Sequence, residues 1–142
     1  MDIKNKRILA IDVGDVRTGV AVSDPLGIIA SPLENIINAS EDELIEKLGP
    51  YISKNGVGTV VIGFPKNMNG TVGERGEKAK RLSEEIEKTY KVETVLWDER
   101  LTTVSALRAL SEGKVRGKKR RGKVDGLSAV LILQGYLDKR RS

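Results

Sequence analysis

The sequence predicts an α/β fold in which helices cover both faces of a five-stranded mixed sheet. Three short apolar segments joined by turns come first, at residues 7–12, 17–24 and 28–36. Such closely spaced strands are expected to form an antiparallel meander. Two further apolar runs, at 58–64 and 92–97, then alternate with helical patterns, as in parallel crossover units. The fourth strand is therefore expected between the first and the fifth.

The turn residues support the meander. A tight turn at Gly14–Val16 joins the first two predicted strands, and Asp24-Pro25-Leu26-Gly27 joins the second to the third. Pro32 interrupts the third strand, because proline has no backbone N–H to donate to a neighbour. The third strand is therefore expected at an edge of the sheet.

Helical patterns fill the spaces between the later strands. Ser40 and Glu43 have the spacing of a capping box before an apolar stripe, and Pro50 predicts a kink or an early end of that helix. Thr71 and Glu74 form a second possible capping box. The helix after it is expected to bury Ala79, Leu82 and Ile86.

Two more helices are expected at residues 102–110 and 125–137. The chain of 142 residues has no internal repeat and no linker that would divide it, so residues 1–142 are expected to form a single domain. Its one low-complexity segment is a basic loop at about 113–124, which is expected to be flexible.

Composition excludes several kinds of chemistry. The sequence contains no cysteine and no histidine, which excludes disulfides, thiolate zinc sites and histidine-dependent hydrolysis. No apolar stretch approaches the roughly 20 residues of a membrane helix, and the N-terminal segment lacks a signal-peptide core. A cytoplasmic protein without a membrane partner is the expectation.

The net charge of +5 is concentrated in one segment. Residues 114–123 hold seven of the 25 basic residues and no acidic one, which leaves 18 basic against 20 acidic residues elsewhere. Such a segment is typical of binding to a polyanion, although a solvated charge run is the commoner explanation. The run ends one residue before Asp125, which favours the functional interpretation.

Three acidic residues stand where predicted elements begin or end. Asp12 ends the first strand, Glu99 follows the fifth, and Asp125 opens the last helix. Mg²⁺ prefers such oxygen ligands together with substrate phosphates, and this chemistry needs no histidine. Glu99 would have to extend across roughly 10 Å of sheet, over the fourth strand. Gly63 near the end of that strand has no side chain and could leave room for it.

Each acid also has an ordinary explanation. Asp12 could belong to a hairpin turn, Asp125 could be an N-cap, and Glu99 could form a surface ion pair with Arg100 or Arg108. Asp98 is the weaker ligand candidate, because strand alternation directs it away from Glu99. Singly these signals are weak, and together they favour a metal site.

Several side chains could bind phosphate beside these acids. Arg17 follows Asp12 across the tight turn, and its guanidinium could bind two phosphate oxygens, although a surface ion pair is as plausible. Thr102 and Thr103 could donate hydroxyls to a phosphate or cap a helix. The few aromatic residues, with Trp97 expected in the core, favour recognition of a nucleic acid through its backbone.

The motifs resemble the YqgF/RuvX family nearly end to end. The resemblance is carried by four strings in order: Asp12-x-Gly14-x-x-Arg17-x-Gly19, Gly63-Phe64-Pro65-x-Asn67-Met68-x-Gly70, Asp98-Glu99-Arg100-Leu101-Thr102-Thr103 and Asp125-x-x-x-Ala129-x-Leu131-Ile132-Leu133-Gln134. Family members usually carry Lys-Leu-Ala-Ala after the last aspartate, where this chain has Gly126-Leu127-Ser128-Ala129. This difference removes no proposed ligand.

The resemblance implies a ribonuclease H-like fold and a nuclease that depends on Mg²⁺ or Mn²⁺. Asp12, Glu99 and Asp125 would be the catalytic metal ligands. The nucleic-acid contacts expected in this chain are Arg17, Arg100, Thr102, Thr103, Lys118, Lys119, Arg120 and Arg121. No site for an organic cofactor is expected.

Three functions remain open at this point. The first is an endonuclease in 5′-end maturation of the 16S rRNA precursor, a role associated with the family, acting on structured RNA. The second is a Holliday junction resolvase acting on branched DNA, for which a dimer would be favoured, although the sequence leaves the choice between monomer and homodimer open. The third is a non-catalytic RNA-binding factor of ribosome assembly. An actin-like ATPase is disfavoured, because that fold closes two such domains around a nucleotide.

Overall fold

A computed structural model describes residues 6–66, 69–101 and 126–141. Its elements are, in chain order, β1 (Arg7–Asp12), β2 (Arg17–Ser23), β3 (Ala30–Ile37), α1 (Glu41–Asn55), β4 (Val57–Phe64), α2 (Glu74–Tyr90), β5 (Glu93–Asp98), the 3₁₀ turn η2 (Glu99–Leu101) and α4 (Leu127–Arg141). The helix expected at 102–110 and the basic loop lie outside the described residues. All five predicted strands are present, with boundaries within two residues of the expected ones.

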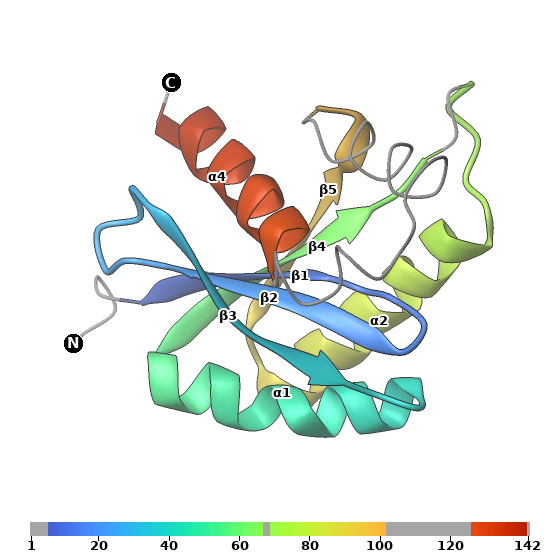
Figure 1. Cartoon of the computed structure of the whole chain (residues 1–142), viewed down its shortest axis with the longest axis horizontal. Helices are drawn as coiled ribbons and strands as arrows, with labels where there is room; N and C mark the ends of the chain where they lie inside the picture. Colours follow the sequence, from blue (N-terminus) through green and yellow to red (C-terminus); the bar gives the residue numbers. More distant parts are fainter. Residues whose placement is uncertain (1–5, 67–68, 102–125, 142) are drawn as a thin grey trace, which may run out of the picture.

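The strands form one mixed sheet in the order β3-β2-β1-β4-β5 (Figure 1). β1 pairs with β2 and β2 with β3 in antiparallel fashion, whereas β4 pairs in parallel with both β1 and β5. The predicted topology is therefore confirmed, including the place of β4 between β1 and β5. β3 is an edge strand, as its proline predicts.

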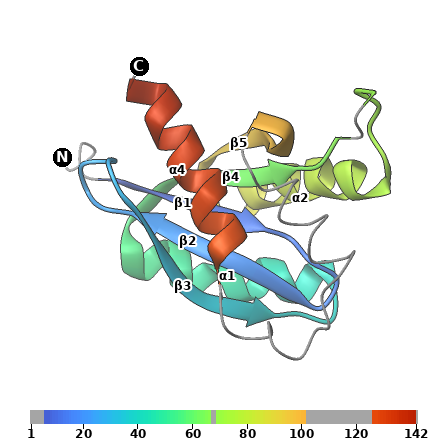
Figure 2. The ribbon, with the colours of Figure 1, turned by 45° about the horizontal axis from the view of Figure 1, so that its top comes forward.

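The helices lie on both faces of the sheet. α1 and α2 cover one face and α4 crosses the other, as the two views of the ribbon agree (Figures 1 and 2). Two hydrophobic cores result from this arrangement. Leu9 and Ile11 of β1 pack on the side of α1 and α2, whereas Ile8 and Ala10 pack on the side of α4. This alternation is that of a strand buried on both faces.

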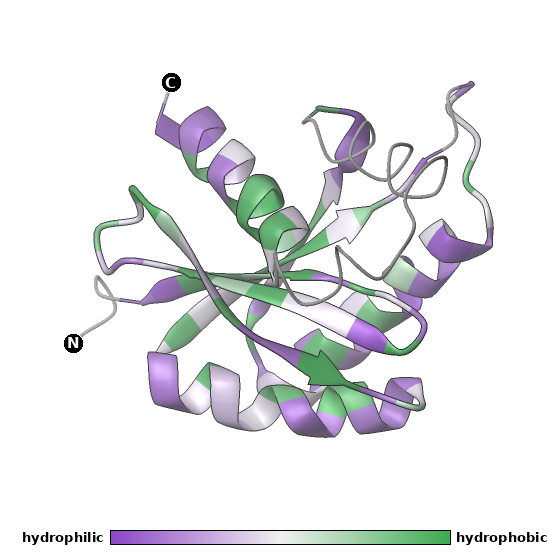
Figure 3. Cartoon of the chain, viewed as in Figure 1, coloured by the Kyte–Doolittle hydropathy of each residue, from purple (hydrophilic) through white to green (hydrophobic). Residues whose placement is uncertain are grey.

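The hydropathy of the residues matches the position of these cores between the sheet and the helices. The central strands and the first turns of α4 are apolar, whereas the last turns of α4 are hydrophilic (Figure 3). Ala129, Ile132, Leu133 and Leu137 make up the buried side of α4. Trp97 belongs to this core, as predicted, and its ring meets Tyr136 edge-on at 6.3 Å between centroids. No helix within the described residues is long and apolar enough to cross a membrane.

The turn between β2 and β3 has the predicted chemistry. The Asp24 carboxylate accepts hydrogen bonds from the backbone N–H groups of Ile28 and Ile29, each at 2.8 Å. These bonds lower the pKa of Asp24, the one from Ile29 most strongly. Gly27 adopts a φ of +71°, in the left-handed region that glycine occupies without strain.

The first helix begins as predicted but does not end early. Ser40 is its N-cap and accepts a hydrogen bond from the backbone of Glu43 at 3.1 Å. Pro50 lies inside α1, which continues to Asn55, so the expectation of an early end is wrong. The buried residues Leu48 and Ile52 lie on either side of Pro50. Their packing against the sheet compensates for the missing backbone hydrogen bond.

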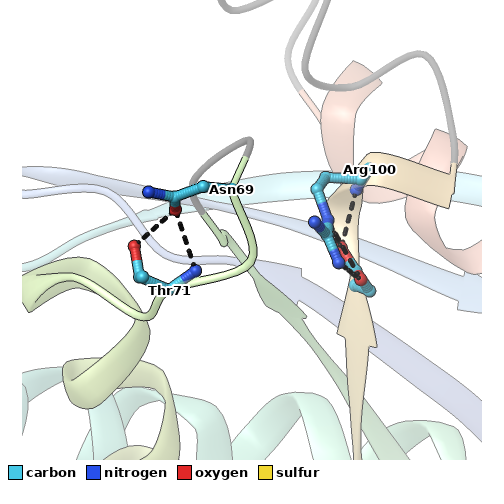
Figure 4. A network of polar contacts seen from close by, with 4 residues as sticks. Asn69, Thr71 and Arg100 are labelled. Carbon is cyan, nitrogen blue, oxygen red and sulfur yellow. Dashed lines mark hydrogen bonds and ion pairs between the residues drawn. The ribbon is translucent and has the colours of Figure 1, made fainter.

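The second predicted capping box is wrong. The N-cap of α2 is Gly73, which has no side chain to accept a capping hydrogen bond. Thr71 instead bonds to the side-chain oxygen of Asn69, through its hydroxyl at 2.7 Å and its N–H at 3.0 Å (Figure 4). The Thr71 hydroxyl is therefore engaged in this short turn instead of capping the helix. Serine and threonine side chains often form such local hydrogen bonds with nearby groups. The buried face of the helix is as predicted, with Ala79, Leu82 and Ile86 in the core.

Candidate metal and nucleic-acid site

Asp12 ends β1 on the face that α4 covers. Ile8 and Ala10 belong to the core beneath α4, so alternation along the strand places Asp12 on the same face. Its partner across the antiparallel pair is Gly19. A Cβ atom at Gly19 would lie 3.7 Å from both the Ala129 Cβ and the Gly126 Cα. The start of α4 therefore packs beside the strand residue opposite Asp12.

Glu99 is the first residue of η2, directly after β5, and only 3% of it is exposed. Its carboxylate lies over Gly63 of β4, where a Cβ atom would stand 2.6 Å from Glu99 Oε2. The same Cβ would be 2.7 Å from Ile132 Cδ1 of α4. The expectation that Gly63 leaves room for Glu99 is confirmed. The Glu99 side chain is therefore buried rather than at the surface, and Arg108, one of its two suggested ion-pair partners, lies outside the described residues.

The structure brings Asp12 and Glu99 to the same edge and face of the sheet. Ile11 pairs in parallel with Ile62, and the next residues along the two strands are Asp12 and Gly63. Both of these residues face α4, and the Glu99 carboxylate lies above Gly63. Glu99 thus extends from β5 over β4, toward the strand that Asp12 ends.

The third predicted ligand, Asp125, lies outside the described residues. Its neighbour Gly126 is described and stands immediately before α4, with its carbonyl accepting the bond from Val130 N–H at 2.8 Å. The helix thus begins at Leu127 rather than at Asp125. Among the described residues no cluster of three or more acidic side chains could hold a metal ion, so the complete ligand set stays a prediction.

Asp98 is directed away from Glu99, as predicted. It is the strand partner of Phe64, which belongs to the core under α1 and α2. Its carboxylate accepts hydrogen bonds from Arg100, through Nη2 at 2.8 Å, Nε at 3.1 Å and the backbone N–H at 3.0 Å (Figure 4). The bond from the Arg100 side chain is the main cause that lowers the pKa of Asp98. Arg100, a predicted phosphate contact, therefore makes an ion pair with Asp98 in this structure.

Arg17 is exposed at the start of β2. The next residue, Thr18, is fully buried and donates a hydrogen bond to Asn38 Oδ1 at 2.9 Å. Alternation along the strand therefore directs Arg17 to the opposite face, which is that of Gly19 and α4. Gly14 allows the turn to close, because a Cβ atom there would overlap the carbonyl oxygen of Arg17. The guanidinium is thus available on the face that carries Asp12.

The other predicted contacts lie outside the described residues: Thr102, Thr103, Lys118, Lys119, Arg120 and Arg121. The structure instead shows two cations that sequence reasoning missed. Arg75 and Lys78 of α2 line a pocket together with Gly63 and Glu99. Their three-residue spacing on one helix face was visible in the sequence. The approach of that face to Glu99 was not, because it depends on how α2 packs on the sheet.

The chain matches known proteins over nearly its whole length. Residues 6–139 match the family model described as "RuvX: Holliday junction resolvase". A relative from Acetivibrio thermocellus is 46% identical over 136 residues, and the match covers 94% of this chain and 96% of the relative. A relative from Clostridium perfringens is 47% identical over 133 residues, covering 94% and 97%. Both carry the name "Putative pre-16S rRNA nuclease".

Solved structures agree on the fold. T. thermophilus RuvC in complex with a Holliday junction substrate matches with a TM-score of 0.64 at 10% identity, over 96% of each chain. The resolvase of Fowlpox virus in complex with Holliday junction DNA matches with a TM-score of 0.56 at 8% identity, covering 96% of this chain and 99% of the resolvase. The sheet order and these neighbours confirm the ribonuclease H-like fold, and the extent of the family match shows that the chain belongs to the RuvX family.

Proposed function

We propose that this chain is a metal-dependent endonuclease that hydrolyses phosphodiester bonds in the precursor of 16S rRNA. The observation that carries the proposal is the buried Glu99 carboxylate over Gly63, on the same edge and face as Asp12. Carboxylate oxygens at one end of a sheet are the ligands that Mg²⁺ prefers, so this placement of two acids suits a metal site. The name of the relatives and the family match support the substrate.

The residues present suit Mg²⁺ or Mn²⁺. Asp12 and Glu99, together with Asp125, would supply hard oxygen ligands, and the chain contains no histidine or cysteine that would favour a softer metal. The burial of Glu99 lowers the local dielectric and so strengthens its attraction for a cation. When bound, the ion supplies activation of water and stabilisation of the leaving oxygen.

The remaining contacts would hold the substrate. Arg17 projects on the face of Asp12 and would bind a backbone phosphate with its two-pronged guanidinium. Thr102 and Thr103, which follow Glu99 in the chain, would donate hydrogen bonds from their hydroxyls to a phosphate. Arg100 would bind the same phosphate after its ion pair with Asp98 breaks. The loop with Lys118, Lys119, Arg120 and Arg121 would bind the RNA backbone electrostatically, without reading its sequence. A cytoplasmic location is part of this proposal, because the proposed substrate is a precursor of ribosomal RNA.

A second candidate is cleavage of four-way DNA junctions. It is favoured by the description of the family model and by the fold shared with RuvC and the Fowlpox virus resolvase. The likeness to these structures is one of fold, at 10% and 8% identity. The 44–47% identical relatives carry the RNA assignment, so the RNA substrate ranks first.

The deciding experiment compares cleavage of 16S precursor RNA and of a four-way DNA junction, with Mg²⁺ and with Mn²⁺. The variants are Asp12→Asn and Glu99→Gln, and the matched control is Glu84→Gln, which changes an exposed acid on α2. We expect RNA cleavage by the wild type and the control, at least 100-fold slower cleavage by the other two, and retained RNA binding. The shift in melting temperature caused by Mn²⁺ should be lost in the same two variants.

Each other outcome has a distinct meaning. Cleavage of the junction but not the RNA would support the resolvase instead. Cleavage of neither substrate, with RNA binding intact, would support a non-catalytic assembly factor. Unchanged cleavage by Asp12→Asn and Glu99→Gln would exclude the proposed ligands.

A further inference from the structure

A pocket on the α2 side of Glu99 joins the acidic site to a basic helix face. Its wall contains Gly63 and Glu99, together with Arg75 and Lys78 from the first two turns of α2. Arg75 also lines the neighbouring pocket, where Lys66 contributes another cation. Arg75 is therefore shared by the two pockets, and the acidic Glu74 also lines the second one.

The packing of α2 explains why these cations lie at the site. Gly76 is buried, and a Cβ atom there would lie 2.6 Å from Val72 Cγ1 and 3.2 Å from both Phe64 Cε1 and the Pro65 carbonyl oxygen. The first turn of α2 therefore rests directly against the end of β4. The close approach holds Arg75 beside the strand end that Glu99 covers. Ala79, three residues after Gly76, is also buried and lines the pocket next to Lys78.

Both cations lack an acidic partner among the described residues. The Arg81 guanidinium on the same helix pairs with Glu41 at 2.9 Å, which raises its pKa. No ion pair in the described part of the chain includes Arg75 or Lys78. Glu74 precedes Lys78 by four residues, a spacing that favours a helical ion pair, and yet Lys78 lines the pocket instead.

We propose that Arg75 and Lys78 form a second phosphate-binding position, which holds the nucleic-acid backbone on the side of Glu99 away from α4. The inference rests on the proposed function, because it assigns the path that the substrate takes through the same site. Arginine binds two phosphate oxygens at once, and lysine adds a compact positive charge. The acids Asp15 and Glu99 in the pocket wall balance the charges of Arg75 and Lys78. A divalent cation held by Glu99 would therefore make the pocket net positive.

The test is the affinity for 16S precursor RNA in EDTA over a range of salt concentrations, with single-turnover cleavage in Mg²⁺ measured separately. The test variant combines Arg75→Ala with Lys78→Ala. The control combines Lys80→Ala with Lys88→Ala, which removes the same charge from exposed positions of the same helix. Melting temperatures of both variants check that α2 still folds.

We expect the test variant to bind RNA about tenfold more weakly than the control at 0.1 M salt. The slope of log affinity against log salt should be smaller in magnitude in the test variant than in the control, by about 1.4 to 1.8. This is the difference expected for two lost phosphate contacts. Equal affinity and equal slope in the two variants would overturn the inference. Because binding is measured without a metal, this result is independent of whether the wild type cleaves RNA, so failure of the proposed function would be recognised separately.

Discussion

The carboxylate of Glu99 occupies the space that a side chain at Gly63 would fill. A Cβ atom on Gly63 would lie 2.6 Å from Glu99 Oε2, well inside van der Waals contact. Gly63 stands on β4, between the strand that Asp12 ends and the strand that precedes Glu99. The missing side chain therefore lets an acid cross one strand of the sheet and approach another.

Replacement of Gly63 by alanine should displace Glu99 and reduce cleavage strongly. We expect the cleavage rate to fall at least about 100-fold, because a small misplacement of a catalytic group has an effect of this size. The matched control is Gly58→Ala on the same strand, where the three atoms nearest to a Cβ atom all belong to the side chain of Lys6. Cleavage by Gly63→Ala at the rate of Gly58→Ala would contradict the role of this space.

Replacement of Asp98 by asparagine should destabilise the fold in a pH-dependent way. The hydrogen bond from Arg100 lowers the pKa of Asp98 below its value of about 3.9 in the unfolded chain. A lowered pKa contributes stability above the unfolded value, and this stability is lost as the pH falls through the folded one. We expect a loss of about 1 kcal/mol at pH 7, as for a partly exposed ion pair. Urea unfolding should show the difference shrinking below pH 4.

The basic loop should supply a large part of the salt-dependent binding. Replacement of Lys118, Lys119, Arg120 and Arg121 by alanine should weaken RNA binding and flatten its salt dependence, because fewer phosphates are neutralised. A control variant with Lys54, Lys80 and Lys88 changed to alanine alters exposed cations elsewhere. Titration of labelled RNA at several salt concentrations measures both effects. An unchanged slope in the loop variant would refute the role of the loop.

Gly126 should resist substitution more than other glycines with a positive φ. Its φ is +75°, and a Cβ atom would lie 3.1 Å from both Pro32 Cβ and the Val20 carbonyl oxygen. Gly27 has a similar φ of +71°, but the nearest atom is 3.9 Å away, on the Arg140 side chain. We expect Gly27→Ala to lose about 1 kcal/mol of unfolding free energy and Gly126→Ala to lose more. Urea unfolding of both variants measures the difference, and equal losses would show that crowding has no effect.

Much of the fold could be predicted from local patterns. Apolar runs with short turns identify the strands, because a buried strand must be apolar on both faces. The sequence also predicted that β4 lies between β1 and β5, which puts Gly63 of β4 in the path of Glu99 toward Asp12. The errors arose where packing outweighed local preference. α1 continues through Pro50 because Leu48 and Ile52 are held in the core. α2 begins at Glu74 with Gly73 as its N-cap, and the Thr71 hydroxyl bonds to Asn69 instead of capping the helix.

The sequence by itself determined which acids end the strands, which segment carries the charge, and to which family the motifs are similar. Only the tertiary structure decided that the Glu99 side chain is almost completely buried and that Arg75 and Lys78 of α2 line a pocket with it. The physical reason is that burial and side-chain direction depend on contacts between elements distant in the chain. Residue type and spacing predict that residues 74–90 form a helix. The close packing of Gly76 on Phe64 then decides which part of the sheet this helix, α2, lies against.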